Sequence, residues 1–271
     1  MNTWCPEVIA TPVRFFSESR QHWSLIWSIF RHNYILKHKD TWLGNFWLLM
    51  NPCIPVILYN LLQYLGVFSN NQDGIPRAVY LTLGLIVYYT FSESLSKLTS
   101  CCTGNRVFLL AGGVQKSAVI MATLLEVVFN FLIRYTLYII LLIANDFPIL
   151  DALIFVPALA LFPILLGGGL GIFLSVFDVI SRDISNAVNM ICFYLLFGSG
   201  VFSAIERSNL FFTILSYSPI YLVIDFCRDL VFWDGANLTR PLLVSMCAAV
   251  AIFIMSLVGF YRVESKINSY L

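Results

Sequence analysis

The stretch RHNYILKHKDTWLGNFWLLMNPCIPVILY, residues 31–59, carries the clearest information about how this chain is built. Its basic first part passes through Trp-Leu-Gly at 42–44 into a run that contains no charged residue. Such a sharp change from charged to apolar side chains is typical of the point where a chain enters a lipid bilayer. Pro52 and Pro55 lie inside the apolar run, where each removes a backbone donor and bends a helix. The stretch therefore predicts the entry into a first membrane-spanning helix.

The composition of the whole chain indicates the same class. Of its 271 residues, 59% are hydrophobic and only 11% are charged, whereas about a quarter of a typical soluble domain is charged. At roughly 20 apolar residues per crossing, we expect an all-α integral membrane protein with six spans and no second folded domain. The net charge of +1 gives no indication of a nucleic-acid partner. The predicted spans are residues 43–68, 78–95, 117–144, 152–177, 184–204 and 242–260.

Residues 14–38, ahead of the first span, predict an amphipathic helix. One side of its helical wheel gathers the large side chains Trp23, Ile26, Trp27, Phe30 and Tyr34. Such a stripe suits a helix that lies in the membrane interface with its tryptophans at headgroup depth. It equally suits a helix packed on the rest of the protein, and both interpretations stay open.

Two connections between the predicted spans have a composition of their own. Residues 96–116 are polar and basic, and they hold a short apolar piece at 107–111 between glycine-containing turns, which predicts a short helix. Residues 206–240 hold apolar pieces interrupted by Ser218-Pro219, and none is long enough to span. We expect this second segment to form paired half-helices that dip back toward the membrane.

The basic residues predict the orientation of the chain. Six spans place both termini on one side, which collects eleven lysines and arginines against four on the opposite side. Because cytoplasmic loops carry the excess of Lys and Arg, we expect both termini and the short helix at 107–111 in the cytoplasm. Residues 206–240 then face outward.

Three polar residues interrupt the third predicted span. Glu126, Asn130 and Arg134 are spaced four apart and therefore share one face of a helix. Ionisable groups are costly in lipid, so we expect this face to turn away from it. It forms either the polar wall of a conduit or a set of pairs satisfied between helices, and both interpretations stay open.

The fourth predicted span contains the cluster GGGLG at residues 167–171. Gly167 and Gly171 form a GxxxG spacing, which predicts close packing against a neighbouring helix. The cluster does not fit a phosphate-binding loop, because no Gly-Lys-Ser/Thr follows it.

No motif in the sequence indicates catalysis or metal binding. The seven cysteines are scattered without a CxxC pair, and all three histidines lie in the N-terminal segment. The sequence has neither an HExxH motif nor a phosphate-binding loop for ATP. We therefore expect a protein that is not an enzyme, with no catalytic residue and no metal site.

The chain resembles the ABC-2 family of permeases that export polysaccharides, its O-antigen and capsule group in particular, with teichoic-acid exporters close by. The resemblance is most specific in a pattern around the first span that is carried by Lys39, Thr41, Leu43, Gly44, Trp47 and Pro52. Further along the chain it rests on Arg182-Asp183 after the fourth span and on Ser218-Pro219-Ile220-Tyr221 with Arg228 before the last span.

The resemblance implies an ABC-2 exporter fold with an N-terminal interfacial helix, a cytoplasmic coupling helix and periplasmic re-entrant gate helices. It implies a homodimer in the bacterial inner membrane that works with two copies of a separate nucleotide-binding ATPase subunit. ATP and magnesium would belong to that subunit, so no cofactor is expected in this chain. The implied cargo is a polysaccharide linked to undecaprenyl pyrophosphate, such as the O-antigen of lipopolysaccharide. The alternatives are an ABC-2 exporter of capsule, teichoic acid, a drug or another lipid, and an integral-membrane enzyme of glycan assembly.

The resemblance also implies roles for individual residues at the two ends of the bundle. Contact with the ATPase falls on Asn105, Arg106, Val107, Phe108, Leu109 and Leu110. The periplasmic gate falls on Phe211, Phe212, Pro219, Tyr221 and Arg228.

The chemistry of the implied cargo suggests further candidates. Sugar rings present apolar CH faces that stack on aromatic side chains. The cargo path is therefore expected along Tyr59, Tyr88, Tyr89 and Phe91, together with Glu126, Asn130 and Arg134. Three basic residues either attract the pyrophosphate or serve only to fix the topology: Arg31, Lys37 and Lys39.

Overall fold

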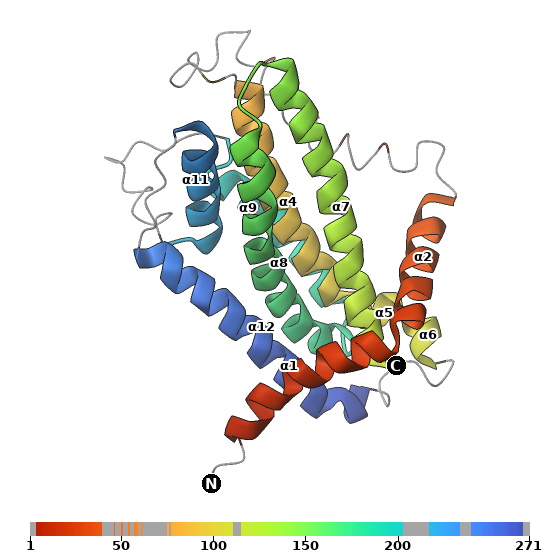
Figure 1. The fold of residues 1–271 in the computed structure, drawn as a ribbon. Helices are drawn as coiled ribbons and strands as arrows, with labels where there is room; N and C mark the ends of the chain where they lie inside the picture. The colour runs from red at the N-terminus through yellow and green to blue at the C-terminus, as the bar shows by residue number, and fades with distance from the viewer. Residues whose placement is uncertain are drawn as a thin grey trace.

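The computed structural model describes residues 4–39, 77–110, 115–202, 217–233 and 240–267, with a few isolated positions between 46 and 75. Within these residues every regular element is a helix (Figure 1). The helices are α1 (Trp4–Gln21), α2 (Trp23–Lys39), α4 (Arg77–Thr99), α5 (Cys101–Gly104), α6 (Arg106–Leu110), α7 (Lys116–Ala144), α8 (Leu150–Asp178), α9 (Asp183–Gly198), α11 (Pro219–Phe232) and α12 (Arg240–Ile267).

Four of the described helices are long and apolar enough to cross a membrane, which confirms the all-helical membrane class. They correspond to the second, third, fourth and sixth predicted spans. Their bounds are Ala78–Thr99 in α4, Lys116–Ala144 in α7, Leu150–Asp178 in α8 and Arg240–Val263 in α12.

The first and fifth predicted spans have other outcomes. Residues 43–68 lie outside the described part of the chain, apart from isolated positions. For the fifth span, predicted at 184–204, the structure has the 16-residue helix α9. At about 24 Å this helix is shorter than the roughly 30 Å hydrocarbon core. It ends early because Gly200 adopts a left-handed backbone, with φ of 72°, a common way to terminate a helix.

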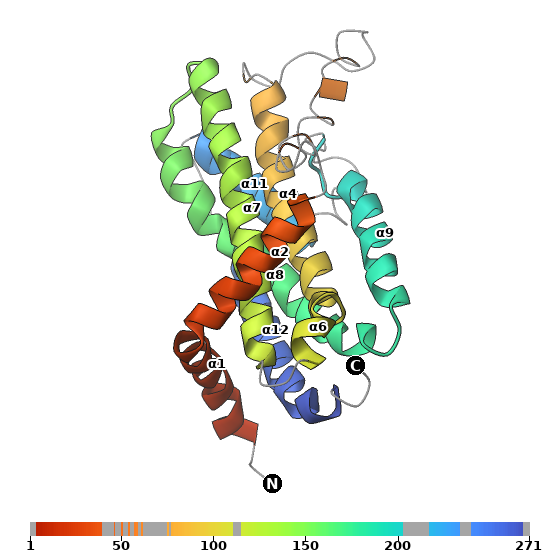
Figure 2. The same cartoon turned by 90° about the vertical axis from the view of Figure 1, so that its right-hand side faces the viewer.

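The helix α8 packs against α4 by direct approach of the two backbones (Figures 1 and 2). A Cβ atom on Gly167 would lie 2.5 Å from the carbonyl oxygen of Phe91, and one on Gly171 would lie 2.8 Å from that of Leu95. No side chain fits at either position without displacing the main chain of α4. The packing role predicted from the GxxxG spacing is therefore confirmed.

The N-terminal segment forms two helices that change direction at His22 (Figure 1), rather than the single helix predicted over 14–38. α1 crosses the ends of α7 and α12, whereas α2 contacts α7 and crosses it obliquely (Figure 2). The change of direction allows Phe15 of α1 and Ile26 of α2 to bury their side chains in one apolar cluster.

The predicted apolar stripe of this segment divides between two surroundings. The rings of Phe30 and Tyr34 both pack against Phe129 of α7, with centroids 5.8 and 5.1 Å from it. Trp23 and Trp27 face outward and are 49% and 53% exposed. The segment is therefore packed on the bundle and still presents two indole rings to its surroundings.

Candidate functional site

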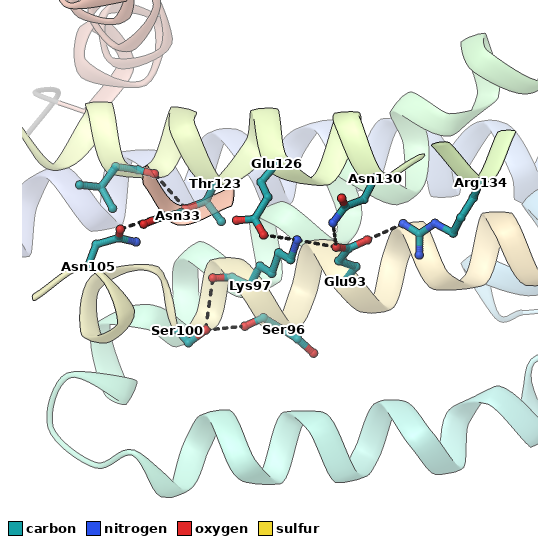
Figure 3. Close-up of polar contacts among 11 residues, drawn as sticks. Asn33, Glu93, Ser96, Lys97, Ser100, Asn105, Thr123, Glu126, Asn130 and Arg134 are labelled. Carbon is teal, nitrogen blue, oxygen red and sulfur yellow. Dashed lines mark hydrogen bonds and ion pairs between the residues drawn. The ribbon is translucent and has the colours of Figure 1, made fainter. Parts of the chain in front are cut away.

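The short helix α6 lies near the end of the bundle that α1 crosses (Figures 1 and 2). Asn105 directly precedes it and is buried, and its Oδ1 accepts a hydrogen bond from Asn33 Nδ2 of α2 at 2.8 Å (Figure 3). The ring of Phe108 packs edge-on against His32, with 4.8 Å between centroids. The short helix predicted at 107–111 is thus present, and α2 supports it.

The outer side of α6 is partly open. Arg106 is exposed, and the side chains of Phe108 and Leu109 are half-buried. Val107 and Leu110 belong to the helix, but their side chains lie outside what the structure describes. α6 therefore presents an exposed cation, Arg106, on a helix whose other side is held by α2.

A charged network joins α4 to α7 inside the bundle (Figure 3). Glu93 of α4 lies at its centre: Lys97 Nζ is 2.5 Å from Glu93 Oε1, and Asn130 and Arg134 of α7 both donate hydrogen bonds to the same carboxylate. Lys97 Nζ also lies 2.6 Å from Glu126 Oε1. The four charged side chains are between 6% and 14% exposed. Two carboxylates and two cations thus neutralise each other away from bulk water.

The predicted polar face of α7 is present, since Glu126, Asn130 and Arg134 all reach partners on α4. Their contacts are pairs between helices, so the structure favours this interpretation over an open polar wall. A buried charge that loses its partner costs several kcal/mol. Mutual pairing is the physical reason that a membrane-spanning helix tolerates these residues.

Sequence reasoning missed Glu93 and Lys97, which are the α4 half of the network. The prediction ends the second span at 95 and assigns Lys97 to a loop, but α4 continues to Thr99. Lys97 is largely enclosed by its two carboxylates, and Lys116 is buried at the start of α7. Two of the basic residues counted as loop charges therefore lie inside the protein. The i, i+4 spacing of Glu93 and Lys97 is the signal that indicates such a pair.

The aromatic residues predicted to line a path have different surroundings. Tyr88 and Phe91 are buried in the main hydrophobic cluster, at 1% and 3% exposure, and the Tyr88 hydroxyl donates to the carbonyl oxygen of Cys192 in α9. Tyr89 is half-buried beside them, and Tyr59 lies outside the described residues. The rings of Tyr88 and Phe91 are enclosed in this structure and have no face free to stack on a sugar, and their place on a cargo path stays a prediction.

The predicted outward segment contains α11, in which Arg228 is buried at 2% exposure. Its guanidinium donates hydrogen bonds to the carbonyl oxygens of Gly200 at 3.1 Å and Val201 at 2.7 Å. It also lies 3.7 Å from the centre of the Tyr80 ring, a cation–π contact. Arg228 thus joins α11 to the start of α4 and to the chain just after α9.

Two glycines leave room for the side chains of Arg228 and Tyr221 where α11 meets α4 and the chain after α9. A Cβ atom on Gly84 would lie 2.6 Å from the Arg228 guanidinium, and one on Gly200 would lie 2.5 Å from the ring of Tyr221. The predicted gate residues Tyr221 and Arg228 therefore both pack at the place where α11 meets α4 and the chain just after α9. A movement of α11 relative to α4 and to the chain just after α9 would break these contacts.

Of the remaining predicted site residues, the structure describes the surroundings of only Arg31 and Pro219. Arg31 is exposed on α2. Pro219 is the first residue of α11, where its missing N–H is not needed. The structure does not describe the side chains of the remaining residues: Lys37, Lys39, Phe211 and Phe212.

A polar contact ties α1 to α12. Tyr261 donates a hydrogen bond to Glu18 Oε2 at 2.8 Å, and Arg14 Nε lies 2.7 Å from Glu18 Oε1. Partial burial acts to raise the pKa of Glu18, but the bonds from Arg14 and Tyr261 and the charge of Arg14 outweigh it and hold the pKa below its usual value. The contact is therefore strongest when the carboxylate is ionised.

No protein-family model matches this chain, and no curated protein matches its sequence.

Proposed function

We propose that this chain is the membrane subunit of an ATP-driven exporter of the ABC-2 type, a homodimer in the bacterial inner membrane. The observation that carries the proposal is the position of α6. This short helix lies between two spanning helices, at one end of the bundle, with Arg106 exposed and Asn105 held by Asn33 of α2. A small surface element fixed to the ends of the spans is suited to receive a push from a separate protein and to pass it on.

The proposed cargo is a polysaccharide linked to undecaprenyl pyrophosphate. Arg31 is exposed on α2, the helix that supports α6, and a guanidinium binds phosphate groups well. Trp23 and Trp27 on the same helix suit the headgroup region of the membrane. Arg31 would attract the pyrophosphate at the cytoplasmic face before the glycan enters the membrane.

The first test asks whether ATP hydrolysis depends on a partner. The purified chain in lipid vesicles should show no ATPase activity, and it should form an active complex when it is co-expressed with a nucleotide-binding subunit encoded beside it. ATP should then drive a lipid-linked glycan across the vesicle membrane. ATP hydrolysis by the chain alone would contradict the proposal.

The second test reverses the charge on the proposed contact surface. Arg106→Glu should lower the amount of partner ATPase that co-purifies by about tenfold, the effect of losing one good charged contact in an interface. Arg240→Glu is the matched control, because Arg240 is exposed at the start of α12, on the opposite side of the bundle from α6 (Figure 1). Equal recovery of the ATPase with both variants would remove the docking role of α6.

A further inference from the structure

The helix α9 lies at the side of the described bundle and is held by few of its side chains. Val188, Cys192 and Leu196, spaced four apart, are its buried residues. Most of the others are exposed, including Phe193 and Phe197 at 60% and 62%. Its attachment to the rest of the described chain therefore depends strongly on the polar contacts near its two ends and at its middle.

Three buried side chains from three different helices make these contacts. Arg228 of α11 holds the chain just after α9, and Tyr88 of α4 donates to the carbonyl oxygen of Cys192 at its middle. The third is Asp178, the last residue of α8, which has no exposed surface. Its Oδ1 accepts a hydrogen bond from the backbone N–H of Ser185 in the first turn of α9, at 3.0 Å.

The carboxylate of Asp178 has a second partner on the α6 side. Its Oδ2 accepts a hydrogen bond from the Thr103 hydroxyl at 2.6 Å. Thr103 belongs to α5, which is separated from α6 by Asn105 alone. One buried carboxylate thus binds the segment that carries α6 with one oxygen and the first turn of α9 with the other.

The physical properties of this contact suit the transmission of movement. Hydrogen bonds to a carboxylate are about twice as strong as neutral ones, and the free N–H groups in the first turn of a helix favour a negative charge. The helix that carries Asp178 is fixed to α4 through Gly171. The Asp178 carboxylate is therefore a pivot on the rigid pair of α4 and α8, and α5 and the first turn of α9 can tilt about it together.

We propose that Asp178 is a positioning residue that couples α5 and α6 to α9, so that a push on α6 shifts α9 against α4. This role rests on the proposed function, because it takes α6 as the contact with an ATPase. The motif Arg182-Asp183 in the turn after the fourth span lies beside Asp178, but it is Asp178 that bonds both α5 and α9.

The test compares two substitutions at Thr103 in the complete complex with its ATPase. Thr103→Val removes the hydroxyl donor and keeps the side-chain shape, whereas Thr103→Ser keeps the donor. Thr103→Val should leave ATP hydrolysis within about twofold and lower the amount of glycan exported per ATP by about tenfold, the effect of one hydrogen bond to a charged group. Thr103→Ser should export normally. Thr136→Val is the remote control, because the Thr136 hydroxyl donates to the carbonyl oxygen of Leu132 within α7.

A second readout follows α9 itself. Hydrogen–deuterium exchange of the α9 amides should change when ATP binds to the native complex, and this change should be lost in Thr103→Val and restored in Thr103→Ser. A normal α9 response together with normal export per ATP in Thr103→Val would overturn the role of Asp178 and leave the proposed function intact. A chain that binds no ATPase would instead overturn the proposed function, and the coupling role with it.

Discussion

The two helices that flank α4, α8 and α7, are held to it by opposite kinds of contact. α8 approaches as bare backbone at Gly167 and Gly171, where a single added carbon would strike the main chain of α4. α7 approaches through charged side chains that meet at Glu93. The contact of α8 with α4 requires that Gly167 and Gly171 have no side chain, and the two helices can pack this closely in only one arrangement. The contact of α7 depends on the balance of four charges, which can exchange partners.

This difference indicates which part of the bundle is fixed. Close-packed surfaces resist displacement, because each atom has only one place to go. Charged pairs between helices tolerate small shifts as long as each charge keeps a partner. We therefore expect α4 and α8 to behave as one rigid unit and α7 to be the neighbour that adjusts.

The largest effect is expected from removing the centre of the charged network. Glu93→Gln should lower the free energy of unfolding by about 3 kcal/mol or more, because it leaves the Arg134 guanidinium buried without its carboxylate. Glu126→Gln is the matched control and should lower the free energy of unfolding by less, since Lys97 still pairs with Glu93. Thermal unfolding of the purified protein in detergent measures both. Equal costs would show that Glu93 is not the centre of the network.

The glycine contact should respond to the smallest possible addition. Gly167→Ala should cost about 2 kcal/mol, within the range for overpacked interiors, because the new carbon meets the Phe91 carbonyl oxygen. Gly259→Ala provides the control in α12, where a Cβ atom meets nothing within 4 Å, and it should stabilise its helix slightly. If the two variants unfolded at the same temperature, α8 would not be fixed by backbone contact.

The smallest effect is expected from the contact that Glu18 of α1 makes with Arg14 and Tyr261. Because the pKa of Glu18 is held below its usual value, its ionised form stabilises the attachment of α1 to α12 at neutral pH. That contribution is present above the ordinary carboxyl pKa of about 4.3 and is lost as the pH falls through the lower, folded-state value. Native protein should exceed Glu18→Gln in stability by less than about 1 kcal/mol at pH 7.

The measurement for this contact is the difference in unfolding temperature between native protein and Glu18→Gln as the pH is lowered. The two proteins should converge at acidic pH. A difference that persists after the carboxylate is protonated would mean that hydrogen bonding by the neutral group, and not the charge, holds α1 in place.

The difference between the backbone contact of α8 and the charged contact of α7 also explains which features could be predicted from the sequence. The spans at α4, α7, α8 and α12 were predictable because contact with lipid requires a long apolar run, which is a local property of the chain. The packing of Gly167 and Gly171 was predictable because bare backbone at GxxxG spacing has few other uses in a span.

The partners of the charged residues were not predictable in the same way. The shared face of Glu126, Asn130 and Arg134 follows from helical periodicity, but their partner Glu93 depends on how α4 is rotated against α7. Lys97 reads as a loop charge because a lone lysine is costly in lipid, and only the two carboxylates beside it explain its position. Asp178 reads as an ordinary turn residue, since its partner Thr103 lies 75 positions away.

The proposed action of a separate ATPase on α6 has one most direct test. A photo-crosslinking amino acid is placed at position 106, or at Tyr217 as the control, in cells that also produce the nucleotide-binding subunit. Tyr217 is 79% exposed and lies two residues before α11. We predict a crosslinked product with the ATPase from position 106 and none from position 217. A product from position 217, or the absence of one from position 106, would contradict the proposed function.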